Sequence, residues 1–216
     1  MESMMVRVIV HKQLPAREIL NNDLWRANYC YFSGGNRGSG IYFYLYGSSS
    51  IPFYIGMCAA KSYNILGRVW NELDDYRNGK YYLPKNPEKL SSLECFTKAS
   101  SHETFFIPGK YDKEDDAFLK ALDTMLNNTR ILFSYLETDP QVDHEQMINV
   151  IYNIEALFQR NVVDTLKLEP KWIGDKGRGY FVDPQFDYTL GIVYEDPGLA
   201  NILDTELLLG RRSSGT

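Results

Sequence analysis

The chain has 216 residues and a formal net charge of −5, and its composition of 44% hydrophobic and 24% charged residues is that of an ordinary soluble globular domain. The acidic balance argues against a protein that coats nucleic acid non-specifically, because such a protein would be strongly basic. The three scattered cysteines form no CxxC pair, the N-terminus lacks a signal-peptide pattern and no run of about 18 apolar residues occurs, so we expect a cytoplasmic protein with reduced thiols, no structural zinc and no membrane span.

The N-terminal part predicts one strand, one short helix and a loop. Met5 to His11 is expected to form the first strand, and Pro15 to Trp25 a short helix that has the proline near its start. The glycine-rich run from Ser33 to Ser39 is then expected to be a loop. This loop either links two elements or shapes a binding cleft.

The next two segments predict a β-hairpin. Gly40 to Tyr46 and Phe53 to Met57 both alternate aliphatic or phenyl side chains with tyrosine or glycine, which is typical of strands. If the apolar faces meet one core, Tyr42 and Tyr54 project to the same opposite side. We expect Gly56 to keep that side open to a phosphate. Taken alone, the two tyrosines are more simply explained as a packed cross-strand pair.

The remainder predicts three helices and two strands. Asp143 is a plausible N-cap for the last helix, and Gln146 completes a capping box. The tail from residue 167 is expected to be irregular or to form short strands. The expected elements are a helix over 63–78, a loop over 80–101, a strand over 102–107, a helix over 113–128, a strand over 129–137 and a helix over 143–166.

These elements predict an α/β (α+β) protein, with a small antiparallel β-sheet flanked by helices and additional segments at both ends. The length favours a single domain over residues 1–216.

The tripeptides Gly40-Ile41-Tyr42 and Tyr54-Ile55-Gly56 are separated by eleven residues, with Arg68 in the following helix and Glu155 in the last one. This order of motifs resembles the GIY-YIG nuclease family. The resemblance covers about residues 40–166, with an insertion over about 79–128, an N-terminal extension over 1–39 and a C-terminal extension over 167–216.

The resemblance implies a site for hydrolysis of a phosphodiester. It implies that Arg68 binds the non-bridging oxygens and that Glu155 holds one divalent cation, Mg²⁺ or Mn²⁺. Tyr42 would position or deprotonate the attacking water, and Tyr54 would support it or hold the phosphate. Because a free phenol titrates near pH 10, Tyr42 would need the metal or Arg68 to lower its pKa.

Each role has a rival explanation in the sequence. Arg68 could simply pair with Glu72 four residues later, as exposed helix residues do. Glu155 could lie on a solvated flank, although its place at the edge of an apolar stripe favours a site. Glu72 also stands where many family members have a histidine, and Asn161 points away from the face of Glu155, so it does not supply the asparagine that the family has after its glutamate.

Contacts with nucleic acid are expected from basic residues outside the core. Lys61 lies in a loop that is longer than usual in the family and is a candidate phosphate contact. In the tail, Lys171, Lys176 and Arg178 interleave with Trp172 and Tyr180, a pattern that suits backbone contacts and stacking. A solvated surface loop is the commoner outcome for such a pattern.

The expected function is divalent-metal-dependent hydrolysis of double-stranded DNA. A compact type II restriction enzyme acting as a homodimer is the leading role, and a repair, phage or mobile-element nuclease remains open. Two other classes remain as alternatives. One is a catalytically inactive GIY-YIG-like module that binds nucleic acid or regulates, and the other is a protein-interaction domain rich in surface tyrosine.

Overall fold

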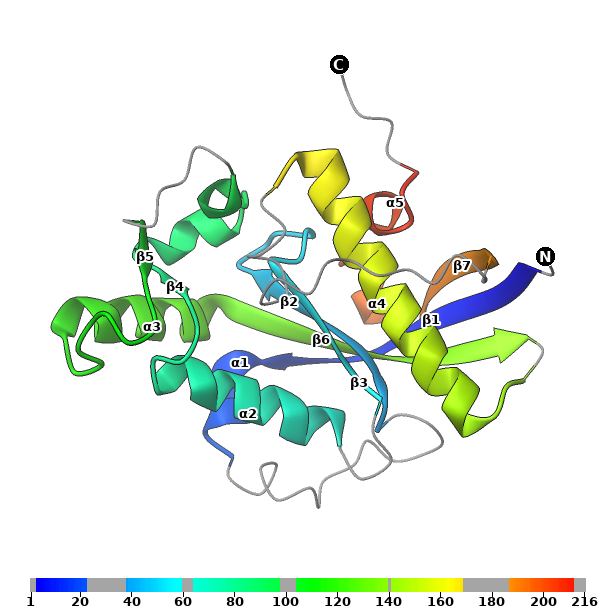
Figure 1. Cartoon of the computed structure of the whole chain (residues 1–216), viewed down its shortest axis with the longest axis horizontal. Coiled ribbons are helices and arrows are strands. Elements are labelled where there is room, and N and C mark those ends of the chain that lie inside the picture. Colours follow the sequence, from blue (N-terminus) through cyan, green and yellow to red (C-terminus); the bar gives the residue numbers. More distant parts are fainter. Residues whose placement is uncertain are drawn as a thin grey trace.

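The computed structural model describes residues 3–22, 38–59, 64–97, 104–139, 141–168 and 187–211. Its centre is a five-stranded sheet in which the two longest strands run side by side across the molecule (Figure 1). In spatial order the strands are β3 (Tyr54–Cys58), β2 (Gly40–Tyr46), β6 (Thr129–Asp139), β1 (Ser3–Pro15) and β7 (Asp187–Tyr194).

The predicted α/β fold class is confirmed, and the sheet is mixed. The four strands from β3 to β1 pair antiparallel, as the sequence predicts, whereas β7 pairs in parallel with β1. In the hairpin, Tyr42 lies opposite Gly56 and Tyr44 lies opposite Tyr54. The sequence predicts irregular structure or short strands in the tail. The structure instead has β7, a strand of eight residues at the edge of the sheet.

The first strand is longer than the predicted Met5–His11. It continues to Pro15, which still pairs with Arg130 of β6 after an irregularity between Val10 and Lys12. Pro15 then serves as the N-cap of the short helix α1 (Ala16–Leu20). A fixed proline φ suits this entry into a helix, so the predicted start is close. The predicted end at Trp25 lies outside the described residues.

The three long helices start at side-chain caps. Helix α2 (Ile65–Arg77) begins after Asn64, whose side chain accepts from the Leu66 amide, and α3 (Asp116–Asn128) begins after Asp115. Helix α4 (His144–Leu166) has the predicted capping box between Asp143 and Gln146. These caps satisfy amides that a helix start otherwise leaves without partners.

Helices cover both faces of the sheet at the hairpin. On one face, the Phe43 ring lies 5.9 Å from the Phe158 ring of α4. On the other face, the tyrosine side chains meet α2. Every residue of β2 is therefore buried. The tyrosine face of the hairpin is an interior surface and not the open side that the sequence suggested.

The segment predicted as a loop over 80–101 contains regular structure. It includes the strand β4 (Leu83–Pro84) and the short 3-10 helices η2 (Pro87–Leu90) and η3 (Glu94–Phe96). Strand β4 pairs with β5 (Phe105–Phe106), which lies within the strand predicted over 102–107. Strand β4 and the helices η2 and η3 are too short, at two to four residues each, to show a periodic pattern in the sequence.

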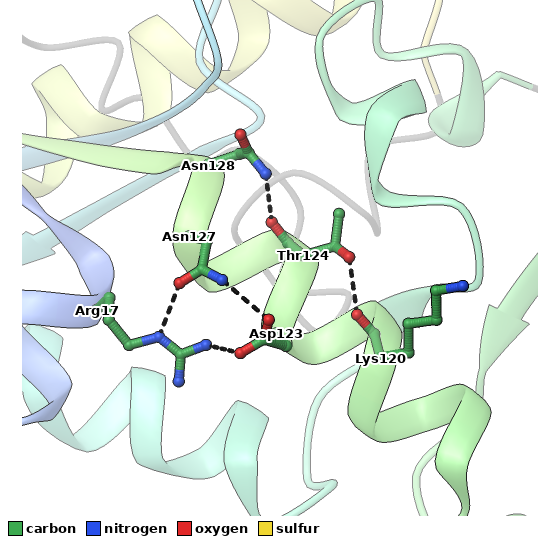
Figure 2. A network of polar contacts seen from close by, with 6 residues as sticks. All are labelled: Arg17, Lys120, Asp123, Thr124, Asn127 and Asn128. Atoms are coloured by element: carbon green, nitrogen blue, oxygen red, sulfur yellow. Dashed lines mark hydrogen bonds and ion pairs between the residues drawn. The ribbon is translucent and has the colours of Figure 1, made fainter.

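A surface network ties α1 to α3. Arg17 forms an ion pair with Asp123, and its Nε donates to Asn127 Oδ1 at 3.0 Å (Figure 2). Asn127 in turn donates to Asp123 at 2.9 Å. Because these contacts lie at the surface, we expect the network to add little to the stability of the fold.

The last short helix of the chain packs on α4. After β7 come the 3-10 helix η6 (Pro197–Leu199) and the short helix α5 (Thr205–Leu208). Asn161 of α4 donates to the Leu208 carbonyl at 2.8 Å. Within the ranges described above, none of the helices combines the length and the apolar character needed to cross a bilayer.

Candidate functional site

One buried carboxylate collects the polar groups of the hairpin and of α2. Glu72 is 2% exposed and accepts hydrogen bonds from Tyr42 (2.7 Å) and Tyr54 (3.0 Å) at Oε1 and from Tyr44 (3.3 Å) at Oε2. Arg68 Nη2 lies 3.0 Å from the same Oε1. We call Tyr42, Tyr44, Tyr54, Arg68 and Glu72 the Glu72 cluster. Such pairing offsets the large cost of burying a charge.

The strand register explains why the phenols converge. Residues two apart on a strand share a face, so Tyr42 and Tyr44 point to the same side, and cross-strand pairing adds Tyr54. The rings lie close together, with centroids 6.2 Å apart for Tyr42 and Tyr54 and 5.0 Å apart for Tyr44 and Tyr54. The predicted common side of Tyr42 and Tyr54 is confirmed.

The two motif glycines make room for protein groups. A Cβ on Gly56 would lie 2.5 Å from the Tyr42 ring and hydroxyl, and a Cβ on Gly40 would lie 1.9 Å from the Ser134 carbonyl oxygen. Because Gly56 has no side chain, the Tyr42 ring can lie over the backbone of Gly56, its pairing partner on β3. The expectation that Gly56 leaves an opening for a phosphate is wrong, because the Tyr42 phenol fills that space.

Arg68 is the half-open member of the Glu72 cluster. Its side chain is 46% exposed, while that of Glu72 is 2% exposed. Burial works to lower the pKa of Arg68, but Glu72, Tyr42 and Tyr54 raise it above its ordinary value. Arg68 and Glu72 do form the pair four residues apart that the sequence allowed, and nearly half of the Arg68 side chain remains exposed.

Glu155 approaches the site from α4. It is half-buried, and it follows the fully buried Ile154, as its place beside the apolar stripe predicted. One turn later, Gln159 donates to the Ile55 carbonyl at 2.8 Å, which fixes this part of α4 against β3. The Glu155 charge is close enough to contribute to the pKa of Tyr54. Tyr54 is therefore the member of the Glu72 cluster on which the Glu155 charge acts.

The phenols are held in the neutral form. Burial first, and then the Glu72 charge, raise the pKa of Tyr42, Tyr44 and Tyr54 well above the ordinary value. Arg68 works in the opposite direction on Tyr42, but its effect is smaller. Burial also raises the pKa of Glu72, against the opposing effects of Arg68 and the three phenols. In this arrangement the phenols donate hydrogen bonds and Glu72 is the acceptor.

Sequence reasoning missed three tyrosines of this region. Tyr44 repeats the spacing of Tyr42 along β2, and Tyr76 lies one turn after Glu72, so both could have been found from periodicity. Tyr81, just beyond α2, packs 5.0 Å from the Tyr76 ring. Burial first, then Glu72, raise the pKa of Tyr81, and Arg68 lowers it, which places its phenol near both charges.

Other predicted site residues lie apart from the cluster or outside the described ranges. Asn161 is engaged with α5, as its orientation away from the Glu155 face predicted. Lys61, Lys171, Lys176 and Arg178 lie outside the described residues.

Among the residues that the structure describes, no group of three or more His, Cys, Asp or Glu side chains is arranged to hold a metal ion. Mg²⁺ often uses only one or two carboxylates together with water and substrate phosphates. Glu155 is a hard oxygen donor of the kind that this cation prefers, so the residues present fit a metal held jointly with a substrate.

Comparison with known proteins finds no match. Protein-family models, curated proteins and solved structures were compared with the chain, and none of them matches it.

Proposed function

We propose that this protein is a divalent-metal-dependent endonuclease that hydrolyses phosphodiester bonds of DNA on a GIY-YIG-like core. One observation supports this proposal above the others. Tyr42, Tyr54 and Arg68 come from three different elements and meet on one carboxylate, and the Glu155 charge acts on the same Tyr54. Simple cross-strand packing would not require the arginine or Glu155 to be present.

The exposed part of Arg68 suits the binding of a phosphate. A transition state at phosphorus concentrates negative charge on the non-bridging oxygens, and a guanidinium offers two parallel donors to them. Glu72 uses one nitrogen of Arg68, at 3.0 Å, and holds the side chain in place. The Tyr42 hydroxyl also forms a hydrogen bond with Arg68. The donors that neither Glu72 nor Tyr42 uses would bind the scissile phosphate.

Glu155 would hold the cation beside Tyr54. A bound Mg²⁺ or Mn²⁺ would neutralise charge on the phosphate and stabilise the leaving oxygen. Glu155 would hold the cation in a fixed position, because the hydrogen bond of Gln159 anchors the same stretch of α4 to β3. The phenol of Tyr54, whose pKa the Glu155 charge helps to raise, would contact the substrate or the attacking water.

The buried carboxylate favours a second candidate function. Glu72 competes with a phosphate for Arg68 and holds the phenols in their neutral form. A scaffold in which this pair is permanent would bind nucleic acid without cutting it. The second candidate is therefore a catalytically inactive nucleic-acid-binding or regulatory module.

A plasmid-cleavage assay tests the proposal. We expect purified protein to nick or linearise supercoiled DNA with Mg²⁺ or Mn²⁺ but not with a chelator. Glu155→Ala should lower the rate by at least about 100-fold, because the metal loses its protein ligand. Cleavage is followed on gels over time at several metal concentrations.

The matched control is Asp164→Asn, which removes an exposed carboxylate from the same helix. This variant should cleave like the wild type, and both variants should unfold at the wild-type temperature. DNA binding without cleavage under either metal would favour the inactive module. A protein that neither binds nor cuts DNA would contradict both candidates.

A further inference from the structure

The three tyrosine residues of the Glu72 cluster differ in how far they are buried. Tyr42 and Tyr44 are 0% and 1% exposed, whereas Tyr54 is partly exposed at the sheet edge. The half-open Arg68 and the half-buried Glu155 lie around the same phenol. A substrate that contacts Arg68 would therefore meet Tyr54, while the Tyr42 side chain remains enclosed.

Beneath Tyr54 lies an acceptor for its proton. The Tyr54 hydroxyl donates to Glu72 Oε1 at 3.0 Å, so no rearrangement is needed for proton transfer between them. Glu72 is 2% exposed, and the described contacts reach its carboxylate only through phenols and Arg68. A proton from the surface would reach Glu72 most directly by way of Tyr54.

We propose that Glu72 accepts the proton of the attacking water through Tyr54, so that Tyr54 is the catalytic phenol and Glu72 a positioning residue that completes the proton path. This inference rests on the proposed nuclease function. It differs from the role that the GIY-YIG resemblance implies for Tyr42, and it gives Glu72 a function of its own.

The step balances in atoms and charge. The water oxygen forms a bond to phosphorus as the bond from phosphorus to the leaving oxygen breaks. The water proton passes to the Tyr54 oxygen while the Tyr54 hydroxyl proton passes to Glu72, so the phenol ends neutral and Glu72 ends as a carboxylic acid. The leaving oxygen takes a proton from bulk water, and Glu72 returns its proton to solvent by the reverse path.

The surroundings of Glu72 suit a proton acceptor. Burial raises its pKa above the ordinary value for a glutamate, although Arg68 and the three phenols act in the opposite direction. A carboxylate with a raised pKa is a stronger base near neutral pH. The charged and titratable groups that face the acceptor or its phenols are Arg68 and Tyr76 from α2, Tyr81 beyond it, Tyr42 and Tyr44 from β2, Tyr54 from β3, and Glu155 from α4.

Cleavage rates of phenylalanine variants separate the two tyrosines. Tyr54→Phe should lower kcat by roughly 10²- to 10⁴-fold, the usual contribution of a general base. Tyr42→Phe should lower it less than about 10-fold, because Glu72 keeps its other donors. Both substitutions remove one hydroxyl and leave the ring packing in place. A larger loss for Tyr42→Phe than for Tyr54→Phe would overturn the proposal.

The pH profile tests Glu72 itself. In the wild type, kcat should fall at low pH as Glu72 becomes protonated, and Glu72→Gln should lose this acid limb together with most of the rate. Glu72→Asp should retain the limb. The double variant Tyr54→Phe/Glu72→Gln should be no slower than the slower of the two single variants, because both substitutions interrupt the same proton path. An acid limb with an unchanged midpoint in Glu72→Gln would exclude Glu72 as the acceptor.

A spectroscopic measurement does not depend on cleavage. If Glu72 is ionised, Glu72→Gln removes a negative charge beside the phenols, and tyrosinate absorbance should appear at lower pH than in the wild type. The control Asp74→Asn changes a carboxylate on the same helix that pairs with Arg77 outside the cluster. An unchanged titration would show that Glu72 is already protonated, and this would end the proposal.

Different results would contradict the proposed nuclease function and the proton path from Tyr54 to Glu72. A wild type that does not cut DNA with any metal contradicts the proposed nuclease, whatever Glu72 does. A wild type that cuts, with an unchanged pH profile in Glu72→Gln, contradicts only the proton path. If Glu72→Gln does not fold, the comparison of Tyr54→Phe with Tyr42→Phe still decides.

Discussion

Gly56 is the residue that makes room for the tyrosine cluster. Gly56→Ala would place a Cβ 2.5 Å from the Tyr42 ring carbons and hydroxyl, so Tyr42 must move and its 2.7 Å hydrogen bond to Glu72 must weaken. Overpacking in a well-packed core costs about 1–3 kcal/mol. We expect the free energy of unfolding, measured in urea, to fall by that amount.

Gly191→Ala is the matched control for this prediction. Gly191 is also a strand glycine, and a Cβ at its position would meet no atom within 4 Å. Its effect on the free energy of unfolding should be below about 0.5 kcal/mol. Equal stability of the two variants would mean that Tyr42 can move without cost.

For single residues, the sequence predicted on which face of a strand a side chain lies better than it predicted whether a charged side chain is buried. Alternation along the two strands was enough to put Tyr42 and Tyr54 on one side, because strand geometry alone determines the face. The burial of Glu72 was not predictable in the same way. Its helix position belongs to a polar stripe with Arg68, and only the phenol hydroxyls on the facing sheet make the interior suitable for a carboxylate.

Gln159 attaches α4 to the edge strand β3. Its side chain donates to the Ile55 carbonyl at 2.8 Å, and it is 4% exposed. Gln159→Leu keeps the volume roughly constant but leaves this buried carbonyl without its side-chain donor, which costs about 1–3 kcal/mol. We expect a lower free energy of unfolding, measured in urea.

The neighbouring exposed residue provides the control for the α4 prediction. Arg160→Leu introduces the same side chain one position further along the helix, where it faces solvent. It should leave the free energy of unfolding within about 0.5 kcal/mol of the wild type. If Gln159→Leu is as stable as Arg160→Leu, the bond to Ile55 does not hold α4 in place.

At the element scale, the sequence predicted what depends on local signals. The capping box of α4 and the alternation of β2 are encoded within a few residues, and both were found. Strand β7 depends instead on parallel pairing with the start of β1, almost the whole chain away, and Gly191 interrupts its pattern. The length of β1 likewise depends on its partner β6, with which Pro15 still pairs.

The whole molecule keeps a polar cluster between the hairpin of the sheet and α2, where both faces of the sheet are covered by helices. Tyr42 and Tyr44 each have a pKa well above the ordinary value, because burial and then Glu72 oppose ionisation. The unfolded chain releases these protons near pH 10, whereas the folded protein retains them. Their contribution to stability is therefore complete below about pH 10 and is lost as the pH rises further.

We therefore expect alkaline unfolding with a steep pH dependence. Each buried phenol should lower the free energy of unfolding by about 1.4 kcal/mol per pH unit above about pH 10, so Tyr42 and Tyr44 together give about 2.8 kcal/mol per pH unit. Urea denaturation between about pH 8 and about pH 11 measures this slope. Tyr44→Phe should reduce it by one proton, while Phe in place of the exposed Tyr152 should not change it. Free energies that stay level across this range would mean that the phenols ionise in the folded protein, and that the Glu72 cluster is open to water.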